Sequence, residues 1–388
     1  MNVLFVTLPE RGHLHPMLGP AAEIARRGHR VAFHAARDIS RTLAAVGFEQ
    51  LRAQEVPPPA ESNRGAALAA LVRDPPSLRA WIKALLLDGV PAATGRLARV
   101  VDELQPSVIV ADPMAYEAPI VAARAGIRWA ALSSSLNPVV PDAMESELIA
   151  TNAWLAADRD ALFARQGLSA RFRVCDCLSP DLTLAFTTEA LVGAPPEGVV
   201  LAGPSRSRGP RGDELDFPWG RLDPDRPIVY LSLGSQVFHQ PRIFATVIEA
   251  ARGEPYTLVI SAGDLAASIA EPDVIALPYV PQLALLPRTA AMITHGGANS
   301  VMEALSFGVP LLVTPICNDQ PHNAHFVEQS GAGIRLDLEH ASASACRAAL
   351  RALIDAGPQR EAAARVATSY GARDGAVIAA DRALALGA

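Results

Sequence analysis

Lysine is nearly absent from this sequence. Of its 34 positively charged residues only Lys83 is a lysine, the net charge is −6, and aromatic residues make up 5% of the chain. A surface that follows a phosphate backbone needs an excess of positive charge, so nucleic-acid binding is not expected. The sequence contains no Gly-Lys-Ser/Thr, which excludes a P-loop. No Gly-x-Gly-x-x-Gly follows its first apolar run, which argues against a dehydrogenase.

Cysteine and long apolar runs are also scarce. The four cysteines include a pair with a single residue between them, a spacing that suits neither a mutual disulfide nor a zinc site. We therefore expect reduced thiols in a cytoplasmic protein. Residues 1–16 lack a basic leader and read as a first strand. No apolar run reaches the roughly 18 residues that cross a bilayer, so we expect no stable membrane insertion. The cysteines are Cys175, Cys177, Cys317 and Cys346.

Apolar residues, by contrast, make up half of the 388 positions, enough for the cores of two domains. In the first half, short apolar runs alternate with stretches of helical spacing. Runs of this kind are typical of strands buried on both faces. The alternation predicts a parallel, doubly wound α/β sheet. The predicted strands are 2–8, 30–34, 107–112 and 129–133, and the predicted helices are 17–27 and the segment that ends at 125.

A change of composition separates the two halves. Residues 203–227 are rich in proline, glycine and charge and show no periodicity, so they predict a linker. Beyond it, further apolar runs predict a second sheet with strands at 228–233, 257–260, 274–276, 291–294 and 309–314. The predicted organisation is two Rossmann-like domains, 1–204 and 227–388, joined by a linker at 205–226.

The segment 293–320 carries the clearest functional signal. His295-Gly296-Gly297 lies between a predicted strand and a predicted helix, 298–307, whose first N–H groups and dipole suit a phosphate. Asn299 and Ser300 in its first turn can donate to phosphate oxygens. Glu303 lies on the same helical face, where its two oxygens suit a ribose diol. The alternative is a tight turn before a helix with an ordinary polar cap.

The complete string resembles the donor-binding signature of glycosyltransferases that attach nucleotide-activated sugars to small lipophilic molecules. In that family a His-Gly-Gly segment, an Asn-Ser pair, a Glu and an Asp-Gln pair recur at this spacing, and Trp-x-Pro-Gln stands where this chain has Tyr279-Val-Pro-Gln. The resemblance implies the GT-B architecture, in which two domains face each other across a cleft and the C-terminal helix crosses back to the first domain. The matching residues are His295, Gly297, Asn299, Ser300, Glu303, Asp319 and Gln320.

The same resemblance implies a catalytic base near the N-terminus. Gly12, His13 and Pro16 match the family's Gly-His-x-x-Pro turn, which we place just past the first strand. An imidazole with a pKa near neutrality is a natural base, and His15 is the competing candidate. Asp112 ends the strand 107–112, where family members often hold the base with an aspartate. The alternative is that Asp112 caps the next helix.

The remaining donor contacts are also implied by the family. Tyr279 would stack on a pyrimidine ring while the backbone of Val280 reads its edge and Gln282 lies near the ribose. Gly234 and Ser235 form a second turn near the diphosphate. Asp319 and Gln320 would bind sugar hydroxyls, unless Asp319 only caps the helix expected from Pro321. His295 and the helix dipole would take the place of a metal ion, so no metal and no cofactor beyond the nucleotide sugar are expected. His322 and His325 have a ligand-like spacing but lack an obvious third ligand.

The acceptor is expected to bind the first domain. We place its pocket along the irregular segments 57–86 and 133–154, although aromatic residues and methionines there are equally typical of core. An apolar lining would suit a polyketide, terpenoid or phenolic compound. The candidate residues are Trp81, Met114, Met144 and Trp154.

These observations predict an inverting glycosyltransferase that moves a hexose from a nucleotide sugar to a hydroxyl of a small apolar molecule. Glu303 favours a ribose with both hydroxyls and hence UDP, while the tyrosine in place of tryptophan leaves dTDP open. Two alternatives remain: a non-catalytic partner protein that binds sugar nucleotides, and a sugar-nucleotide epimerase on the same fold.

Overall fold

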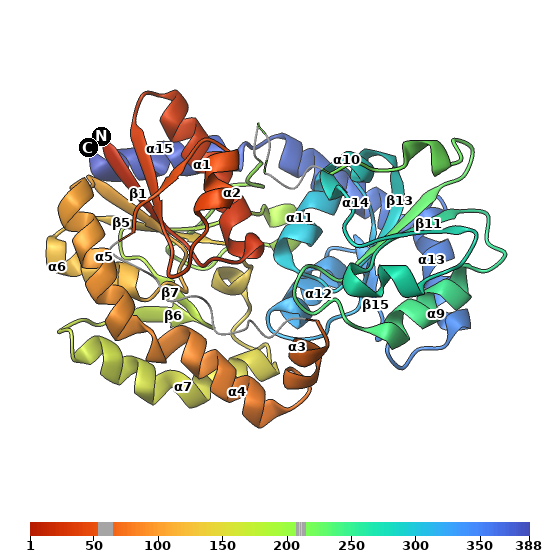
Figure 1. The fold of residues 1–388 in the computed structure, drawn as a ribbon, viewed down its shortest axis with the longest axis horizontal. Helices are drawn as coiled ribbons and strands as arrows, with labels where there is room; N and C mark the ends of the chain where they lie inside the picture. The colour runs from red at the N-terminus through yellow and green to blue at the C-terminus, as the bar shows by residue number, and fades with distance from the viewer. Residues whose placement is uncertain (53–64, 207–208, 210, 212–214) are drawn as a thin grey trace.

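The chain forms two lobes, each built on a parallel sheet with helices on both faces (Figure 1). The computed structural model describes residues 1–52, 65–206, 209, 211 and 215–388. We call the lobe that contains the N-terminus the acceptor lobe and the other the donor lobe, as labels taken from the roles that the sequence predicts. No helix in these ranges is both long enough and apolar enough to span a membrane. The predicted fold class, two Rossmann-like α/β domains, is confirmed.

The acceptor-lobe sheet has the order β3-β2-β1-β4-β5-β8-β9 over the described residues. Every pairing in it is parallel, and the direction of winding reverses between β1 and β4. The strands expected at 30–34 and 129–133 are found with those bounds, whereas the first strand ends two residues early. The strands are β1 (Asn2–Val6), β2 (Arg30–His34), β3 (Glu49–Gln50), β4 (Val108–Ala111), β5 (Trp129–Ser133), β8 (Leu182–Ala185) and β9 (Val199–Leu201).

An antiparallel hairpin, β6 (Arg171–Arg173) with β7 (Asp176–Leu178), lies beside this sheet and was not predicted. Much of the segment expected to be irregular, 57–86, is helical from residue 66, while 53–64 lies outside the described residues. The helices of this lobe are α1 (Arg11–Arg26), α2 (Ser40–Ala45), α3 (Ala66–Leu71), α4 (Pro75–Lys83), a π-helical turn (Ala84–Asp88), α5 (Val90–Leu104), α6 (Glu117–Ala125), a 3-10 turn (Asn137–Val139), α7 (Glu147–Ala164) and α8 (Glu189–Val192).

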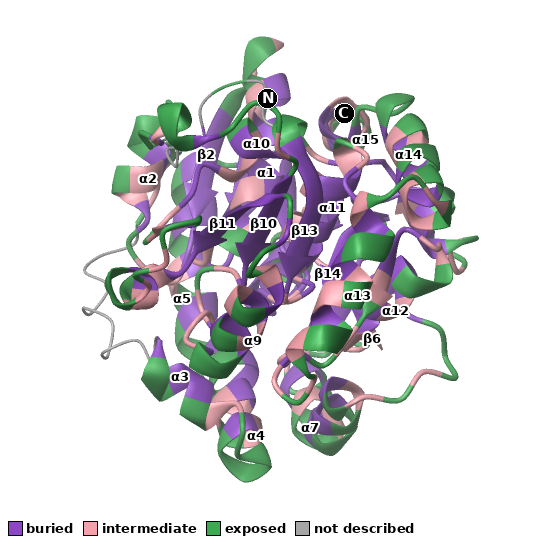
Figure 2. Ribbon diagram, turned by 90° about the vertical axis from the view of Figure 1, so that its right-hand side faces the viewer, coloured by how far each residue is buried: buried purple, intermediate pink, exposed green. Residues whose placement is uncertain are grey.

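The donor-lobe sheet repeats the same plan, with the order β12-β11-β10-β13-β14-β15 and parallel pairings throughout. Its four central strands, β11, β10, β13 and β14, are buried, and the helices around the sheet are exposed on their outer faces (Figure 2). The elements are β10 (Ile228–Ser232), α9 (Pro241–Ala251), β11 (Thr257–Ser261), β12 (Val274–Leu277), α10 (Gln282–Leu285), β13 (Thr289–Thr294), α11 (Ala298–Ser306), β14 (Leu311–Val313), α12 (Gln320–Gln329), β15 (Gly333–Arg335), α13 (Ala343–Ile354) and α14 (Pro358–Gly371), with short 3-10 turns at Trp219–Arg221, Gly263–Ser268 and Leu286–Arg288.

Helix α1 begins six residues earlier than predicted, at Arg11 instead of residue 17. Two prolines, Pro16 and Pro20, lie inside it. Proline removes the hydrogen bond to the carbonyl four residues before it. The fold uses the two released carbonyls. Gly12 O accepts from Asn299 Nδ2 of the donor lobe at 2.8 Å, and Pro16 O accepts from Ser205 Oγ at 2.6 Å. Because the two prolines leave these carbonyls unpaired within the helix, α1 accepts hydrogen bonds from residues outside its own lobe.

The last helix, α15 (Gly375–Gly387), returns to the acceptor lobe and packs against α1, β4 and β5 (Figure 1). The two places where the chain passes between lobes touch each other. Gly375 N–H donates to Pro204 O at 3.2 Å, and a Cβ at Gly375 would collide with the carbonyl oxygens of Gly203 and Pro204. The two connections between the lobes thus lie directly against each other. The predicted linker, 205–226, begins at this point and lies partly outside the described residues.

Candidate active site

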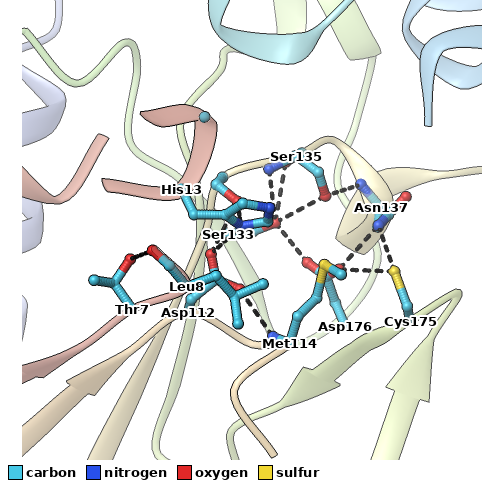
Figure 3. Close-up of polar contacts among 12 residues, drawn as sticks. Thr7, Leu8, His13, Asp112, Met114, Ser133, Ser135, Asn137, Cys175 and Asp176 are labelled. Carbon is cyan, nitrogen blue, oxygen red and sulfur yellow. Dashed lines mark hydrogen bonds and ion pairs between the residues drawn. The ribbon is translucent and has the colours of Figure 1, made fainter. Parts of the chain in front are cut away.

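His13 and Asp112 meet at the point where the acceptor-lobe sheet reverses its winding. His13 lies in the first turn of α1, after β1, and Asp112 follows β4, its direct neighbour in the sheet. His13 Nδ1 donates to Asp112 Oδ2 at 2.7 Å (Figure 3). The loops at such a reversal are where α/β sheets bind ligands. The predicted pair is therefore assembled, although His13 stands on a helix and not in a loop.

Asp112 is held rigidly. It is fully buried, its Oδ1 accepts from the backbone N–H of Met114 at 2.9 Å, and Ser134 Oγ donates to its Oδ2 at 3.0 Å. Ser134 Oγ also lies 2.8 Å from His13 Nδ1. This carboxylate fixes the tautomer of His13 and leaves Nε2 as the nitrogen that can accept a proton. The alternative role of Asp112, as a cap of the next helix, is wrong: α6 begins at Glu117 and its cap position is Tyr116.

The pKa of His13 differs from the expected value near neutrality. Burial acts to lower it, but the charge of Asp112 and the hydrogen bond to Asp112 outweigh burial, and the pKa rises to about 9. Glu10 and Asp319 add smaller contributions in the same direction. Asp319 belongs to the donor lobe, so a carboxylate on the other side of the cleft also helps to raise the pKa of the imidazole. At neutral pH the resting ring is mainly an imidazolium, which must lose its proton before it can act as a base.

The donor lobe places its glycine turns at the corresponding reversal, between β10 and β13. The imidazole of His295 lies between the two turns. A Cβ at Gly234 would lie 2.8 Å from the ring and one at Gly297 would lie 2.7 Å from it. Gly234 also has φ +77°, which a side chain disfavours. Both glycines are therefore required by the position of the ring.

We expect Gly234→Ala to weaken UDP binding about tenfold, because the new methyl group displaces the His295 ring at a strained backbone position. Isothermal titration calorimetry with UDP would measure this. Gly253→Ala is the matched control: Gly253 has φ +75° in the same lobe but nothing within 4 Å of its Cβ position. Equal losses of affinity in the two variants would show that backbone strain, and not the ring, is responsible.

Burial opposes a positive charge on His295. Burial lowers its pKa to about 4, so the ring is neutral at physiological pH. A neutral imidazole still offers one N–H, and the charge that remains is the dipole of α11, whose first turn begins at Gly297 without a side-chain cap. The electrostatic part of the predicted phosphate site therefore rests on the helix and not on the histidine.

The two polar residues in the first turn of α11 are placed differently. Asn299 Nδ2 donates to Gly12 O, one residue before His13, so its side chain bridges the cleft. Ser300 lines the cleft, as does Ser235 in the other turn. The role of Asn299 as a phosphate ligand stays a prediction and would require its amide to leave Gly12.

Glu303 is already paired on both oxygens. Arg211 Nη1 donates to Oε1 at 2.5 Å and Gln282 Nε2 donates to Oε2 at 2.6 Å. The guanidinium and the carboxylate are both largely buried, with side-chain exposures of 9% and 18%. Sequence reasoning missed Arg211, because it lies in the linker segment and belongs to no periodic or family motif.

A second arginine that was missed, Arg11, lies over the ring of Tyr279 with its Cζ 5.4 Å from the ring centroid. This ring is the predicted platform for the pyrimidine, and Arg11 comes from the acceptor lobe. Val280, whose backbone is expected to read the base, is buried beside it. A base that stacks on Tyr279 would have to share or take over the space that Arg11 uses.

Asp319 and Gln320 stand at the start of α12. Asp319 occupies the cap position but its side chain makes no cap hydrogen bond; instead its Oδ2 accepts from Asn323 Nδ2 at 2.9 Å. Burial raises the pKa of this carboxyl while the charge of His13 acts against it. Gln320 Oε1 accepts from the N–H groups of Ile316 and Cys317, so this side chain shapes the loop before α12.

A cleft of about 480 Å³ joins these groups, within the range of pockets that take small molecules. His13, Asp319 and the predicted donor residues line it from the two sides. Of the predicted acceptor contacts, Trp81 and Met114 line the cleft, whereas Met144 packs into the core and Trp154 is an exposed residue of α7. The other apolar lining residues include Leu8, Ile82, Leu86, Leu148, Val237 and Phe238.

Among the described residues, no cluster of three or more possible metal ligands occurs, at His322 and His325 or elsewhere. His322 instead contacts Ser146 and Asn137 of the acceptor lobe. The four cysteines are buried and free.

Comparison with known proteins extends the resemblance over both lobes. Residues 219–384 match the family described as "UDP-glucoronosyl and UDP-glucosyl transferase". The chain is 27% identical to 4'-demethylrebeccamycin synthase of Lentzea aerocolonigenes over 98% of both proteins. It is also 27% identical to L-demethylnoviosyl transferase of Streptomyces niveus, over 98% of this chain and 97% of that one. Among solved structures, the glycotransferase of kitacinnamycin superimposes with a TM-score of 0.80 at 25% identity, over 99% of this chain and 98% of that chain.

Proposed function

Since this chain is a glycosyltransferase with the GT-B fold, we propose that it moves a hexose from a nucleotide sugar, foremost a UDP-sugar, to a hydroxyl of a small, largely apolar natural product, with inversion at the anomeric carbon. The observation that carries this proposal is the pairing of the two sheet reversals across one cleft. One presents His13 with Asp112, and the other presents the N-terminus of α11. Asp319, at the start of α12 after the neighbouring strand β14, lines the same cleft.

In the proposed reaction, His13 Nε2 takes the proton of the acceptor hydroxyl. The oxygen attacks the anomeric carbon from the face opposite the nucleotide, and the bond from that carbon to the phosphate oxygen breaks. The electron pair leaves with the nucleoside diphosphate, whose charge is met by the N–H groups of α11 and by the His295 ring. Asp112 stabilises the imidazolium that forms, and no metal ion is needed in this scheme.

The acceptor proposal rests on the lining of the cleft and on the relatives. Trp81, Ile82, Leu86 and Met114 form an apolar part of the wall of the cleft that His13 also lines. Two of these proteins are named for 4'-demethylrebeccamycin and kitacinnamycin, which supports a natural-product acceptor here. None of these relatives is named as an epimerase or as a non-catalytic partner protein, the two alternative functions.

The direct test is to incubate the protein with UDP-glucose or dTDP-glucose and a panel of polyketide, terpenoid and phenolic aglycones. We expect nucleotide release together with a product one hexose heavier than the aglycone. Absence of any such product with every donor and acceptor, from protein shown to bind UDP, would contradict the proposal.

A substitution at Glu303 tests separately whether the site prefers UDP to dTDP. We expect Glu303→Gln to weaken UDP binding about tenfold, the effect of losing hydrogen bonds to a charged acceptor. Binding of dTDP should fall less, since deoxyribose lacks the 2′-hydroxyl. Calorimetric titration of both nucleotides measures the ratio. Ser306→Ala, at the other end of α11, is the control, and an unchanged ratio in Glu303→Gln would place the ribose elsewhere.

A further inference from the structure

His322 joins the two lobes at a point that the proposed reaction does not explain. It lies in the first turn of α12 in the donor lobe and is completely buried. Its Nε2 is 2.6 Å from Ser146 Oγ and its Nδ1 is 3.4 Å from Asn137 Oδ1, both in the acceptor lobe. Both ring nitrogens are therefore directed across the lobe boundary.

The direction of each hydrogen bond follows from the neighbours. Ser146 caps α7 and its Oγ accepts from the N–H of Ile149, so its own proton is available to His322 Nε2. Nε2 is then the acceptor, which leaves Nδ1–H as the donor to Asn137 Oδ1. This assignment needs a neutral ring, and burial lowers the pKa of His322 to about 4. Donors and acceptors match at both nitrogens.

Asn137 is fixed from the other side. Its Nδ2 donates to Asp176 Oδ1 at 2.9 Å and to Cys175 Sγ at 3.1 Å (Figure 3). These contacts leave Asn137 Oδ1 to face His322 Nδ1. Asp176 is buried, and its other oxygen accepts from Ser133 Oγ at 2.5 Å. Ser133 directly precedes Ser134, which contacts both members of the dyad. Hydrogen bonds therefore connect Ser133 to α12 through Asp176, Asn137 and His322, and the peptide bond between Ser133 and Ser134 links them to the catalytic pair.

On the donor side, the next residue of α12 continues the chain. Asn323 Nδ2 donates to Gly296 O at 2.7 Å and to Asp319 Oδ2 at 2.9 Å. One turn of this helix thus holds the acceptor lobe through His322, and the glycine turn and Asp319 through Asn323. Any shift of α12 relative to Asn137 would move Asp319 relative to His13.

We propose that His322, together with Ser146 and Asn137, forms a clasp that sets the two lobes in the register at which a donor sugar faces His13. We call these three residues the clasp. His322 is a positioning residue: it contacts no reacting atom and acts through α12. This inference rests on the proposed function for its kinetic consequence, while the lobe arrangement that it predicts can be measured without any substrate.

Two measurements on the full chain test the clasp. In His322→Ala, we expect UDP affinity to stay within about twofold, because the predicted UDP contacts lie in the donor lobe, while kcat for transfer falls roughly 10- to 100-fold from misplaced reacting groups. The radius of gyration from small-angle X-ray scattering should rise as the lobes separate. His322→Gln, whose amide offers one donor and one acceptor, should recover part of both losses.

His325→Ala is the control on the same helix and should match the wild type. Ser146→Ala removes the same contact from the acceptor-lobe side. The double variant with His322→Ala should lose no more kcat than the worse single variant, since the two residues share one contact. The clasp is wrong if His322→Ala and Ser146→Ala leave both kcat and the radius of gyration unchanged, or if UDP affinity falls in step with kcat. If the wild type transfers no sugar, the proposed function fails, and the scattering result still decides the clasp.

Discussion

His13→Ala is expected to lower kcat for sugar transfer by about 10³-fold, within the 10²–10⁴ that a positioned base contributes, while UDP binding stays at the wild-type level. The reason is geometric. His13 belongs to the acceptor lobe, whereas the predicted nucleotide contacts lie in the donor lobe, so the substitution removes the base and leaves the nucleotide site in place. Single-turnover kinetics with UDP-glucose and calorimetry with UDP would measure the two effects separately.

His15→Ala is the matched control, because His15 lies half a turn further along α1 and also lines the cleft. It should retain most of the activity. If His15→Ala were the inactive variant and His13→Ala the active one, the base would be His15 and the hydrogen bond between His13 and Asp112 would be structural.

Asp112→Asn should lower the maximal rate about 10²-fold and also change its dependence on pH. The carboxylate holds the pKa of His13 at about 9, so in the wild type kcat/KM rises with pH until the imidazolium loses its proton near that value. Without the negative charge, the pKa of His13 moves down towards its ordinary value near 6.5. The variant should reach its plateau at lower pH and should differ most from the wild type in alkaline solution.

The measurement is kcat/KM between pH 5 and 10, with stability followed in parallel by thermal unfolding. Asp102→Asn offers a control, since Asp102 is an exposed residue of α5 outside the cleft. An Asp112→Asn profile parallel to that of the wild type, only lower, would mean that Asp112 orients His13 without setting its pKa.

Much of the fold follows from local patterns in the sequence. Strands β2 and β5 are continuous apolar runs bounded by polar residues, and they are found where those runs lie. The start of α1 was missed because helical spacing marks the helix only from Met17 and because Gly12, His13 and Pro16 match a family motif that forms a turn. The carbonyls that Pro16 and Pro20 release are used by residues far away in sequence. The helix propensity of residues 11–16 contains no information about Asn299, which lies 287 residues after Gly12 and donates a hydrogen bond to its carbonyl.

The site also contains residues that sequence motifs could identify and contacts that only the folded structure reveals. The donor residues of β13, α11 and α12 are close in sequence, so a motif could find them, and His13 and Asp112 could be paired because their strands are neighbours. Arg11 over Tyr279 and Arg211 on Glu303 depend on the packing of one segment against another lobe. The low pKa of His295 and the high pKa of His13 depend on burial and on charges brought close by folding, which no spacing of residues encodes.

The return of α15 to the acceptor lobe has a consequence for engineering. Because the chain leaves that lobe near Gly203 and re-enters it at Gly375, the donor lobe is, in topological terms, an insertion into the acceptor lobe. The first and last residues meet accordingly, with Gly387 against Met1 (Figure 1). A chimaera that swaps donor specificity must therefore exchange an internal cassette between these two points. A chimaera that replaces the whole chain after Gly203 would also replace α15, and the acceptor lobe would lose the helix that packs against β4 and β5.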